Sequence, residues 1–252
     1  MDVRDAFKFT CRMVLGREVG EMDAYEKYLS EAVVQNKARS IYSKKEVFTT
    51  FGGYCGGARF FDFSAERDKA AKALSKPIDI NKVKDIDSLF GAVGEKLLYG
   101  GNKVLGNSAG VENSDNVVDS SNVLNSYQVF ESRFVAYSFV VRKSDYAFGT
   151  TSSGECAATI RCFYNNNLRR SFECAYGVRS ADSLFCYRIV NCDECMFTFN
   201  AQSKRHMIGN IQFEPARYAQ LKSKLLEEIA GELSKRKRLP FSIVNIHNAR
   251  LD

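Results

Sequence analysis

Ser108–Ser144 reads SAGVENSDNVVDSSNVLNSYQVFESRFVAYSFVVRKS, and this stretch decides the fold because residue types recur in it at fixed intervals. From Ser108 to Thr198, fifteen of the sixteen positions spaced six residues apart are Ser, Thr or Cys, and Leu168 is the exception. These types account for only 38 of the 252 residues, so chance does not explain the pattern. The first six positions midway between them are all valine: Val111, Val117, Val123, Val129, Val135 and Val141.

A repeat of six residues predicts short strands joined by corners. A helix has a period of 3.6 and a plain strand a period of 2, so neither keeps a six-residue pattern on one side. Collagen needs glycine at every third position, which this chain lacks. We therefore predict a mainly β fold, a single-stranded parallel β-solenoid with three six-residue units, or about 18 residues, per coil. Residues whose numbers are divisible by three should point inward. The handedness of the coil stays open.

The 18-residue coil predicts which side chains stack on one another. Cys156, Cys174 and Cys192 should form a structural ladder in the core. A second column should contain Ser126, Ser144, Cys162, Ser180 and Thr198. Stacked hydroxyls can hydrogen-bond along such a column, while the valines bury apolar surface.

The chain divides into three regions by pattern. Residues 1–101 form a mostly helical region, residues 102–213 the solenoid, and residues 214–252 a C-terminal capping helix and tail. In the first region, Val3–Val14 and Asp23–Val34 have helical spacing, and Ile86–Tyr99 should form a helix that stops at Gly100-Gly101. Phe48–Phe63 is aromatic and glycine-rich, which favours short strands and turns. Ser64 is the expected N-cap of the helix that follows.

The C-terminal region should close one end of the solenoid, since a solenoid needs caps. Pro215–Leu233 has the apolar spacing of an amphipathic helix, and Pro215 suits its first turn. The apolar stretch Leu239–Ile246 should add a strand or pack on this helix. The N-terminal region is expected to cover the other end.

Composition is that of an ordinary folded chain, with 45% hydrophobic and 26% charged residues. No apolar run approaches the length of a membrane span, and the N-terminus has no signal-peptide pattern, so we expect a cytoplasmic protein without a membrane partner. Reduced thiols are then expected. The net charge of +6 permits contact with an acidic partner.

The cysteines raise the question of a metal or redox site. Cys192 and Cys195, with Cys174 and Cys186 nearby, could suggest zinc or redox chemistry. Four cysteines between 156 and 192 fall at the same repeat positions as the serines, however, which favours small core residues. We therefore predict no metal and no cofactor.

Other residues offer only loose catalytic patterns. The six-residue units are similar to those of left-handed β-helix acyltransferases, a resemblance that implies a catalytic histidine in a subunit cleft. The chain lacks the glycine and proline habits of that pattern, so a structural or surface role is favoured for His206. His247 is the other histidine. The glycine-rich segment 51–57 lacks the Lys-Ser/Thr of a phosphate-binding loop and is read as a turn. Asp182, Asp193 and Glu194 are loose candidates for paired carboxylates.

Arginine and aromatic residues recur through the second half of the repeat. Arginines beside aromatic rings can bind nucleic acid or an acidic glycan by stacking and ion pairing, and the alternative is ordinary solenoid surface. The candidates within the repeat are Arg169, Arg170, Arg179 and Arg188. The run Lys235-Arg236-Lys237 is a further polyanion candidate, or a solvated helix end.

The segment from Cys186 to Tyr218, with Cys192-Asp-Glu-Cys195 and Asn210-Ile-Gln, resembles a group of uncharacterised Cys- and Asn-rich β-solenoid repeat proteins of poorly studied bacterial and archaeal lineages. The resemblance implies the repeat fold and no activity. The coil repeat alone is similar, more loosely, to bactofilin-like β-helices.

Three function classes are compatible with these patterns. We favour a non-enzymatic structural scaffold or assembly protein that binds a protein partner or self-associates. The alternatives are a binding module for nucleic acid or acidic glycan, and a β-helix transferase or carbohydrate-active enzyme. No residue is identified as catalytic, and the sequence leaves enzymatic activity undecided.

Overall fold

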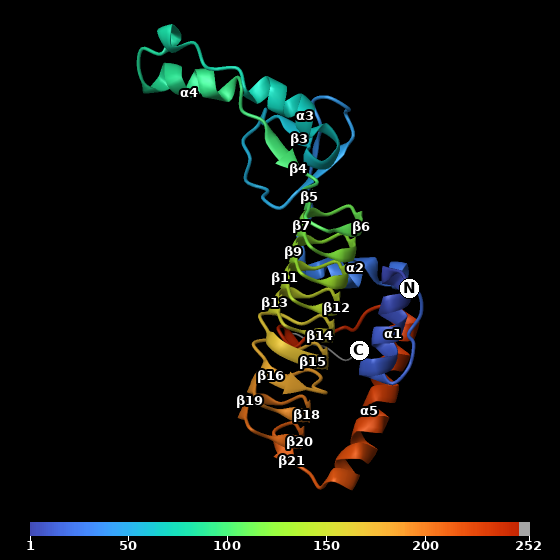
Figure 1. Ribbon diagram of the computed structural model, residues 1–252. Coiled ribbons are helices and arrows are strands. Elements are labelled where there is room, and N and C mark those ends of the chain that lie inside the picture. The colour runs from blue at the N-terminus through green and yellow to red at the C-terminus, as the bar shows by residue number, and fades with distance from the viewer. Residues whose placement is uncertain (247–252) are drawn as a thin grey trace.

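The computed structural model describes residues 1–246 and shows a parallel β-solenoid with helices along one side and a small arm at its N-terminal end (Figure 1). The predicted fold class, a mainly β solenoid with a helical N-terminal region and a C-terminal helix, is confirmed. Before the solenoid come α1 (Val3–Leu15), η1 (Met22–Tyr25), α2 (Glu26–Leu29), η2 (Ser30–Ala32), β1 (Asn36–Arg39), β2 (Glu46–Thr49), β3 (Phe60–Asp62), α3 (Phe63–Leu74), η3 (Ile80–Lys82), α4 (Ile86–Gly94) and β4 (Tyr99–Gly101).

The solenoid and the final helix account for the remaining elements. The solenoid comprises β5 (Val104–Leu105), β6 (Ala109–Glu112), β7 (Asp115–Val118), β8 (Ser121–Leu124), β9 (Tyr127–Phe130), β10 (Arg133–Ala136), β11 (Phe139–Arg142), β12 (Asp145–Phe148), β13 (Thr151–Gly154), β14 (Ala157–Ile160), β15 (Asn166–Phe172), β16 (Val178–Ala181), β17 (Tyr187–Val190), β18 (Asp193–Met196), β19 (Phe199–Gln202) and β20 (Arg205–Ile208). It is followed by β21 (Ile211–Gln212) and α5 (Pro215–Arg236).

The coil contains 12 residues, so the prediction of about 18 is wrong. Strands pair in parallel with the strand two places further on, and Val117 lies opposite Val129, which lies opposite Val141. Each coil therefore holds two six-residue units and two strands. The six-residue period fixes the length of one repeating unit, but coils of two and of three such units satisfy it equally.

A second pattern in the sequence does distinguish the two coil lengths. On one outer face of the solenoid, an apolar side chain recurs every 12 residues. The column contains Leu124, Ala136, Phe148, Ile160, Phe172, Leu184, Met196 and Ile208. The positions six residues away, such as Arg142 and Asn166, are polar in several coils. Helix α1 covers the face whose outer column is apolar in every coil.

Inside the coil, positions with numbers divisible by three are buried along most of the repeat, as predicted. The 18-residue column of cysteines is wrong, because neighbours in a column are 12 apart. Cys162, Cys174 and Cys186 occupy consecutive coils. Cys156 and Cys192 lie in the opposite column, which is traced by Leu168 N donating to Cys156 Sγ and by Cys192 N donating to Ser180 Oγ. All these thiols are buried.

The predicted hydroxyl ladder is present, with 12-residue steps. Ser132 N donates to Ser120 Oγ at 3.0 Å, and Ser144 N donates to Ser132 Oγ at 3.1 Å. The Ser132 hydroxyl in turn donates to Phe130 O at 2.7 Å. Each serine thus satisfies two backbone groups at a buried corner, where an unpaired amide would be costly. This requirement explains why small polar residues recur there.

The backbone turns at every third residue. From Asn113 to His206, the residue just before each inward position has a left-handed φ, between 46° and 60° for the non-glycine residues. Asparagine suits this region, but bulky and branched residues such as Phe134 and Val140 are strained there. The regular left-handed step bends the chain into a tight coil, and the ladder hydrogen bonds offset its cost.

The N-terminal region follows the sequence prediction in part. Helix α1 covers the outer apolar column, with the rings of Phe7 and Phe148 5.3 Å apart. Residues 23–34 form short helical turns (η1, α2 and η2) rather than one helix. Tertiary contacts hold these turns in place, since the Tyr25 hydroxyl donates to the carbonyl oxygen of Leu233 at 2.9 Å.

The arm contains a β1–β2 hairpin, the parallel pair β3–β4, and the helices α3 and α4. Gly100-Gly101 does not stop a helix, because it forms part of β4, and α4 ends at Gly94. A Cβ on Gly101 would lie 2.3 Å from the carbonyl oxygen of Phe48, so close backbone packing requires glycine there. The N-cap of α3 is Asp62 rather than Ser64, whose hydroxyl instead donates to Asn102 O.

Helix α5 begins at Pro215 as predicted, but it runs back along the side of the solenoid beside α1 instead of lying over its end (Figure 1). The last coil is closed locally. The Asn210 side chain pairs with both backbone groups of Phe199, at 2.8 and 2.9 Å, and β21 pairs with β20. The stretch Leu239–Ile246 forms no strand, and Leu239 packs in the core with α5. The arm lies at the other end of the solenoid.

Candidate binding face

The second outer face of the solenoid is not covered by α1 or α5, whose contacts lie on the apolar column and on β20. In its lower half this face exposes large side chains, with Tyr164 57% and Tyr176 47% accessible. We call the surface formed by Tyr164, Tyr176, Arg188 and the adjoining grooves the open face. Near the arm, by contrast, Tyr127 on the same side is buried against Val33 and Phe48.

Two tyrosines and an arginine follow one another at coil spacing on the open face. The rings of Tyr164 and Tyr176 stack in parallel, with their centres 5.1 Å apart and their planes at 6°. Arg188 is the next residue in this column, and it lines a groove of about 350 Å³ with Tyr176 and Val190. The coil register therefore places an aromatic pair and a cation in a row on a rigid sheet.

Three of the arginines singled out in the sequence meet in one groove. Arg169, Arg170 and Arg179 line a groove of about 500 Å³ together with Asp182 and Asp193. The Arg170 guanidinium donates to both carboxylate oxygens of Asp182, and these hydrogen bonds raise its pKa. Within residues 1–246, Arg169 and Arg179 make no ion pair, so their charge is available to a ligand.

The residues of the basic run Lys235-Arg236-Lys237 do not line this groove. Lys235 and Arg236 end α5, and Arg236 pairs with Glu232 one helical turn earlier. The ammonium group of Lys237 reaches Val19 O at 3.4 Å and lies over the ring of Tyr25. Part of this run therefore ties α5 to the N-terminal region.

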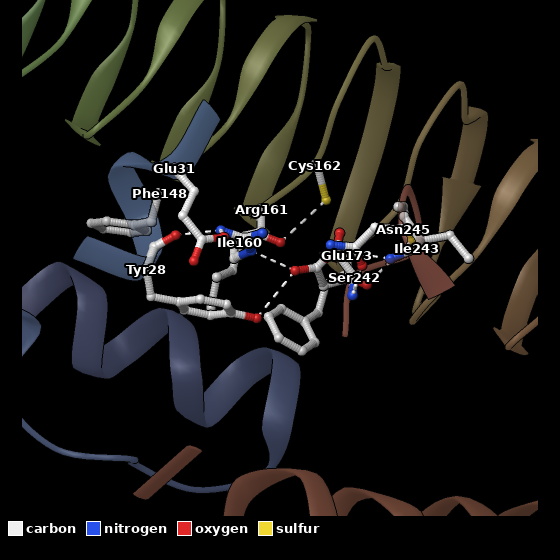
Figure 2. Close-up of polar contacts among 12 residues, drawn as sticks. Tyr28, Glu31, Phe148, Ile160, Arg161, Cys162, Glu173, Ser242, Ile243 and Asn245 are labelled. Atoms are coloured by element: carbon white, nitrogen blue, oxygen red, sulfur yellow. Dashed lines mark hydrogen bonds and ion pairs between the residues drawn. The ribbon is translucent and has the colours of Figure 1, made fainter. Parts of the chain in front are cut away.

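Figure 2 shows a buried ionic network around Arg161 and Glu173. Arg161 and Ser242 of this network line the same cleft as the two tyrosines. Arg161 donates to Glu173, which follows it by one coil, and to the carbonyl of Tyr28. Its guanidinium also lies 2.9 Å from the Glu31 carboxylate and 4.0 Å from the centre of the Tyr28 ring. The Ser242 hydroxyl donates to Glu173 at 2.5 Å. The network therefore fixes an N-terminal and a C-terminal segment to the solenoid.

The electrostatics of this network follow from burial and pairing. Burial and the Glu173 carboxylate raise the pKa of the Tyr28 hydroxyl well above its ordinary value, so the hydroxyl stays protonated and donates to Glu173 at 3.1 Å. Burial is the largest single effect and opposes the charge of Arg161, but Glu173 and the other acidic neighbours together outweigh it, so the pKa of Arg161 is raised. An open cleft of about 370 Å³ lies between Arg161, Tyr164, Tyr176 and Ser242.

This network was not predicted from the sequence. The available signal is the spacing of opposite charges. Salt bridges join residues 12 apart at Arg133–Asp145, Arg161–Glu173, Arg170–Asp182, Asp193–Arg205 and, with a histidine, Glu194–His206. A search for opposite charges at that spacing would have found both the pair and the coil length.

The candidate chemical groups of the sequence are engaged in structural contacts. Burial raises the pKa of Cys156 to about 12, and the buried Cys174 thiol is shifted upward for the same reason, so neither supplies a thiolate at neutral pH. Nε2 of His206 lies 2.8 Å from the Glu194 carboxylate, while His247 lies outside the described residues. Among residues 1–246, no three His, Cys, Asp or Glu side chains are grouped to hold a metal ion.

What the open face offers chemically is stacking, ion pairing and hydrogen bonding. None of the helices in the described part of the chain is long and apolar enough to cross a membrane. Comparison of the chain with protein-family models and with curated proteins finds no match.

Proposed function

We propose that this protein is a non-enzymatic scaffold that binds an acidic protein partner through the open face. The observation that carries the proposal is the row of Tyr164, Tyr176 and Arg188, which are exposed at successive coils of a rigid sheet. Tyrosine and arginine are enriched among the few residues that dominate binding energy at protein interfaces, because they bury large areas and also make polar contacts.

The rigidity of the open face favours binding because its side chains and backbone lose little conformational entropy on association. Tyr164 and Tyr176 sit on a backbone held by the coil-to-coil hydrogen bonds Tyr164 N to Thr151 O and Tyr176 N to Phe163 O, both 2.9 Å long. The buried Arg161–Glu173 pair anchors the flanking segments. The tyrosine rings are therefore presented in nearly the geometry that a partner would meet.

Charge points to an acidic partner. Arg188 is exposed within the row itself, and Arg169 and Arg179, which make no ion pair within residues 1–246, line a separate groove. The whole chain carries a net charge of +6. Opposite charge on the partner would raise the association rate and orient the encounter.

The test compares purification of bound proteins with the wild-type chain and with a Tyr164→Ala/Tyr176→Ala variant, followed by reconstitution with the purified partner. We expect the double variant to weaken the reconstituted complex by about tenfold or more, as loss of an aromatic interface anchor does. Arg217→Glu, an exposed change on α5, is the control and should keep binding. Equal affinity of the double variant and the control variant would overturn the proposal.

A second candidate function rests on the groove of Arg169, Arg170 and Arg179, namely binding of single-stranded nucleic acid or an acidic glycan. Fluorescence anisotropy with labelled RNA, DNA and heparin over a salt series tests it. Binding should fall linearly in log affinity with log salt, and Arg169→Ala/Arg179→Ala should reduce the slope by about 2. Absence of binding at low salt would exclude this function.

A further inference from the structure

We propose that copies of this chain assemble head to tail, with helix α4 of one copy bound in an apolar groove beside α5 of the next. The proposal uses neither Tyr164 nor Tyr176, so it can fail independently of the scaffold function. It rests on two unpartnered apolar surfaces that lie in different parts of the same molecule.

The first surface is α4, which projects away from the solenoid at the end of the arm (Figure 1). Ile86 and Phe90 are each 64% accessible and Leu89 is 37% accessible, and no residue of α4 is buried. With Val93, these residues have the i, i+3, i+4, i+7 spacing of a helix that docks in a groove. The helix is preformed by a capping box between Asp85 and Ser88, so docking need not fold it.

The second surface is an apolar groove of about 530 Å³ between α5 and the tail segment that follows it. Its lining combines solenoid, helix and tail: Phe197, Leu225, Ile229, Leu239, Phe241 and Ile246, with Glu228 and Glu232 as the charged members. A groove of this size and character accepts two or three apolar side chains of a helix.

Charge orients the pairing. Lys82 and Lys84 directly precede α4 and make no ion pair within residues 1–246, and neither does Glu228 of the groove. Asp85, which follows Lys84 in the chain, is occupied in capping α4. An α4 helix seated by its apolar residues can therefore bring unpaired lysines to the Glu228 carboxylate of the groove wall.

The geometry makes the contact intermolecular. The arm lies beyond the N-terminal end of the solenoid, whereas the groove lies alongside the later coils near Phe197, so a chain cannot insert its own α4 (Figure 1). A contact between two different surfaces is heterologous, and it continues as an open chain or a ring instead of stopping at a two-fold dimer.

Two single variants and their mixture test the arrangement by sedimentation velocity. Wild-type chain should grow in mass with concentration beyond a dimer. Phe90→Asp removes the arm contact and Leu225→Asp the groove contact, so each variant alone should stay monomeric. Mixed together, they should form a 1:1 dimer that grows no further, because only one intact arm and one intact groove can meet. Ile211→Asp, a change at an exposed apolar residue outside both surfaces, is the control and should assemble like the wild type.

Specific outcomes would overturn the proposal. Wild-type chain that remains monomeric to about 200 µM would exclude a useful second-copy interface. Mixed variants that fail to dimerise, while both have wild-type circular dichroism and urea midpoints, would exclude the arm-in-groove pairing. Loss of assembly in a chain that ends at Ile246 would assign the contact to residues 247–252. Phe90-dependent binding to lipid vesicles without self-assembly would replace the second copy by a lipid surface.

Discussion

Arg161 and Glu173 occupy the same position in consecutive coils, and their side chains pair while only 5% and 0% accessible. Removing one member leaves the other charged and buried. Arg161→Met should therefore lower the free energy of unfolding by about 3–5 kcal/mol, whereas Arg161→Met/Glu173→Met should recover much of that loss. Urea denaturation measures both.

A matched exposed pair provides the control for this prediction. Arg133 and Asp145 are also 12 residues apart and pair at 2.6 Å, but Arg133 is 64% accessible. Arg133→Met should cost no more than about 1 kcal/mol, because water screens the pair. Equal losses at Arg161 and Arg133 would contradict the role assigned to burial.

The serine ladder predicts that loss of one hydroxyl leaves two backbone groups without their partner. Ser132→Ala should lower the free energy of unfolding by about 1–3 kcal/mol, because Ser144 N loses its acceptor at a buried corner. Ser132→Cys should cost less, since cysteine occupies the same column at Cys156 and accepts from Leu168 N. Equal stability of the alanine variant and the wild type would contradict the ladder.

The left-handed steps predict a stabilising substitution. Val140 has φ 55° on the outer side of the coil, where a branched side chain is strained. Val140→Asn should raise the free energy of unfolding by about 1 kcal/mol, because asparagine tolerates this region. Val178→Asn, at another outer position outside the left-handed set, should give no gain. Thermal denaturation of the two variants makes the comparison.

The coverage of only one outer face predicts unequal effects of two phenylalanines. Phe148 is fully buried under Phe7 of α1, so Phe148→Ala should cost about 3–5 kcal/mol. Phe130 occupies the equivalent position on the opposite face and is only half-buried beside Arg142. Phe130→Ala should lower the free energy of unfolding by clearly less in the same denaturation experiment. A larger loss for Phe130→Ala than for Phe148→Ala would contradict the packing of the helices on the Phe148 face.

Thiol titration tests the role of the cysteines and their pH dependence. Cys55 is the one exposed cysteine of the eight, so the native chain should react rapidly at one thiol, and the unfolded chain at eight. Burial raises the pKa of Cys195 to about 11, so its thiol stays protonated through neutral pH in the folded state. A group with a raised native pKa favours the folded state less as pH rises, so stability should decline from about pH 8 upward. Rapid native labelling of Cys156 or Cys174 would contradict the buried columns.

The sequence predicted the solenoid because its period is short and local. The coil requires Ser, Thr or Cys at every sixth position and apolar residues midway between them, such as the valines from Val111 to Val141. This requirement is the same whether a coil contains two or three six-residue units. The same local pattern could not give the coil length, since both 12 and 18 are multiples of six. Only the outer residues break the symmetry between the two units, as Phe148 and Arg142 do.

The candidate site was predictable only in fragments. Arg169, Arg170 and Arg179 stand out in the sequence, and the register brings them together at one groove. The sequence could not place Tyr28 and Ser242 around Arg161 and Glu173, because these contacts depend on how the terminal segments dock on the solenoid. Tyr28 is more than one hundred residues from Arg161 in the chain.

By itself the sequence determined that the chain coils, which residues face inward, and that cysteine replaces serine as a small core residue. These features depend on interactions between residues close in the repeat. The tertiary structure decided that two units close a coil, that α5 lies along the solenoid rather than over its end, and that one face stays open. Those outcomes depend on which outer surface becomes buried, because the apolar column from Leu124 to Ile208 gains most by packing against α1 and α5.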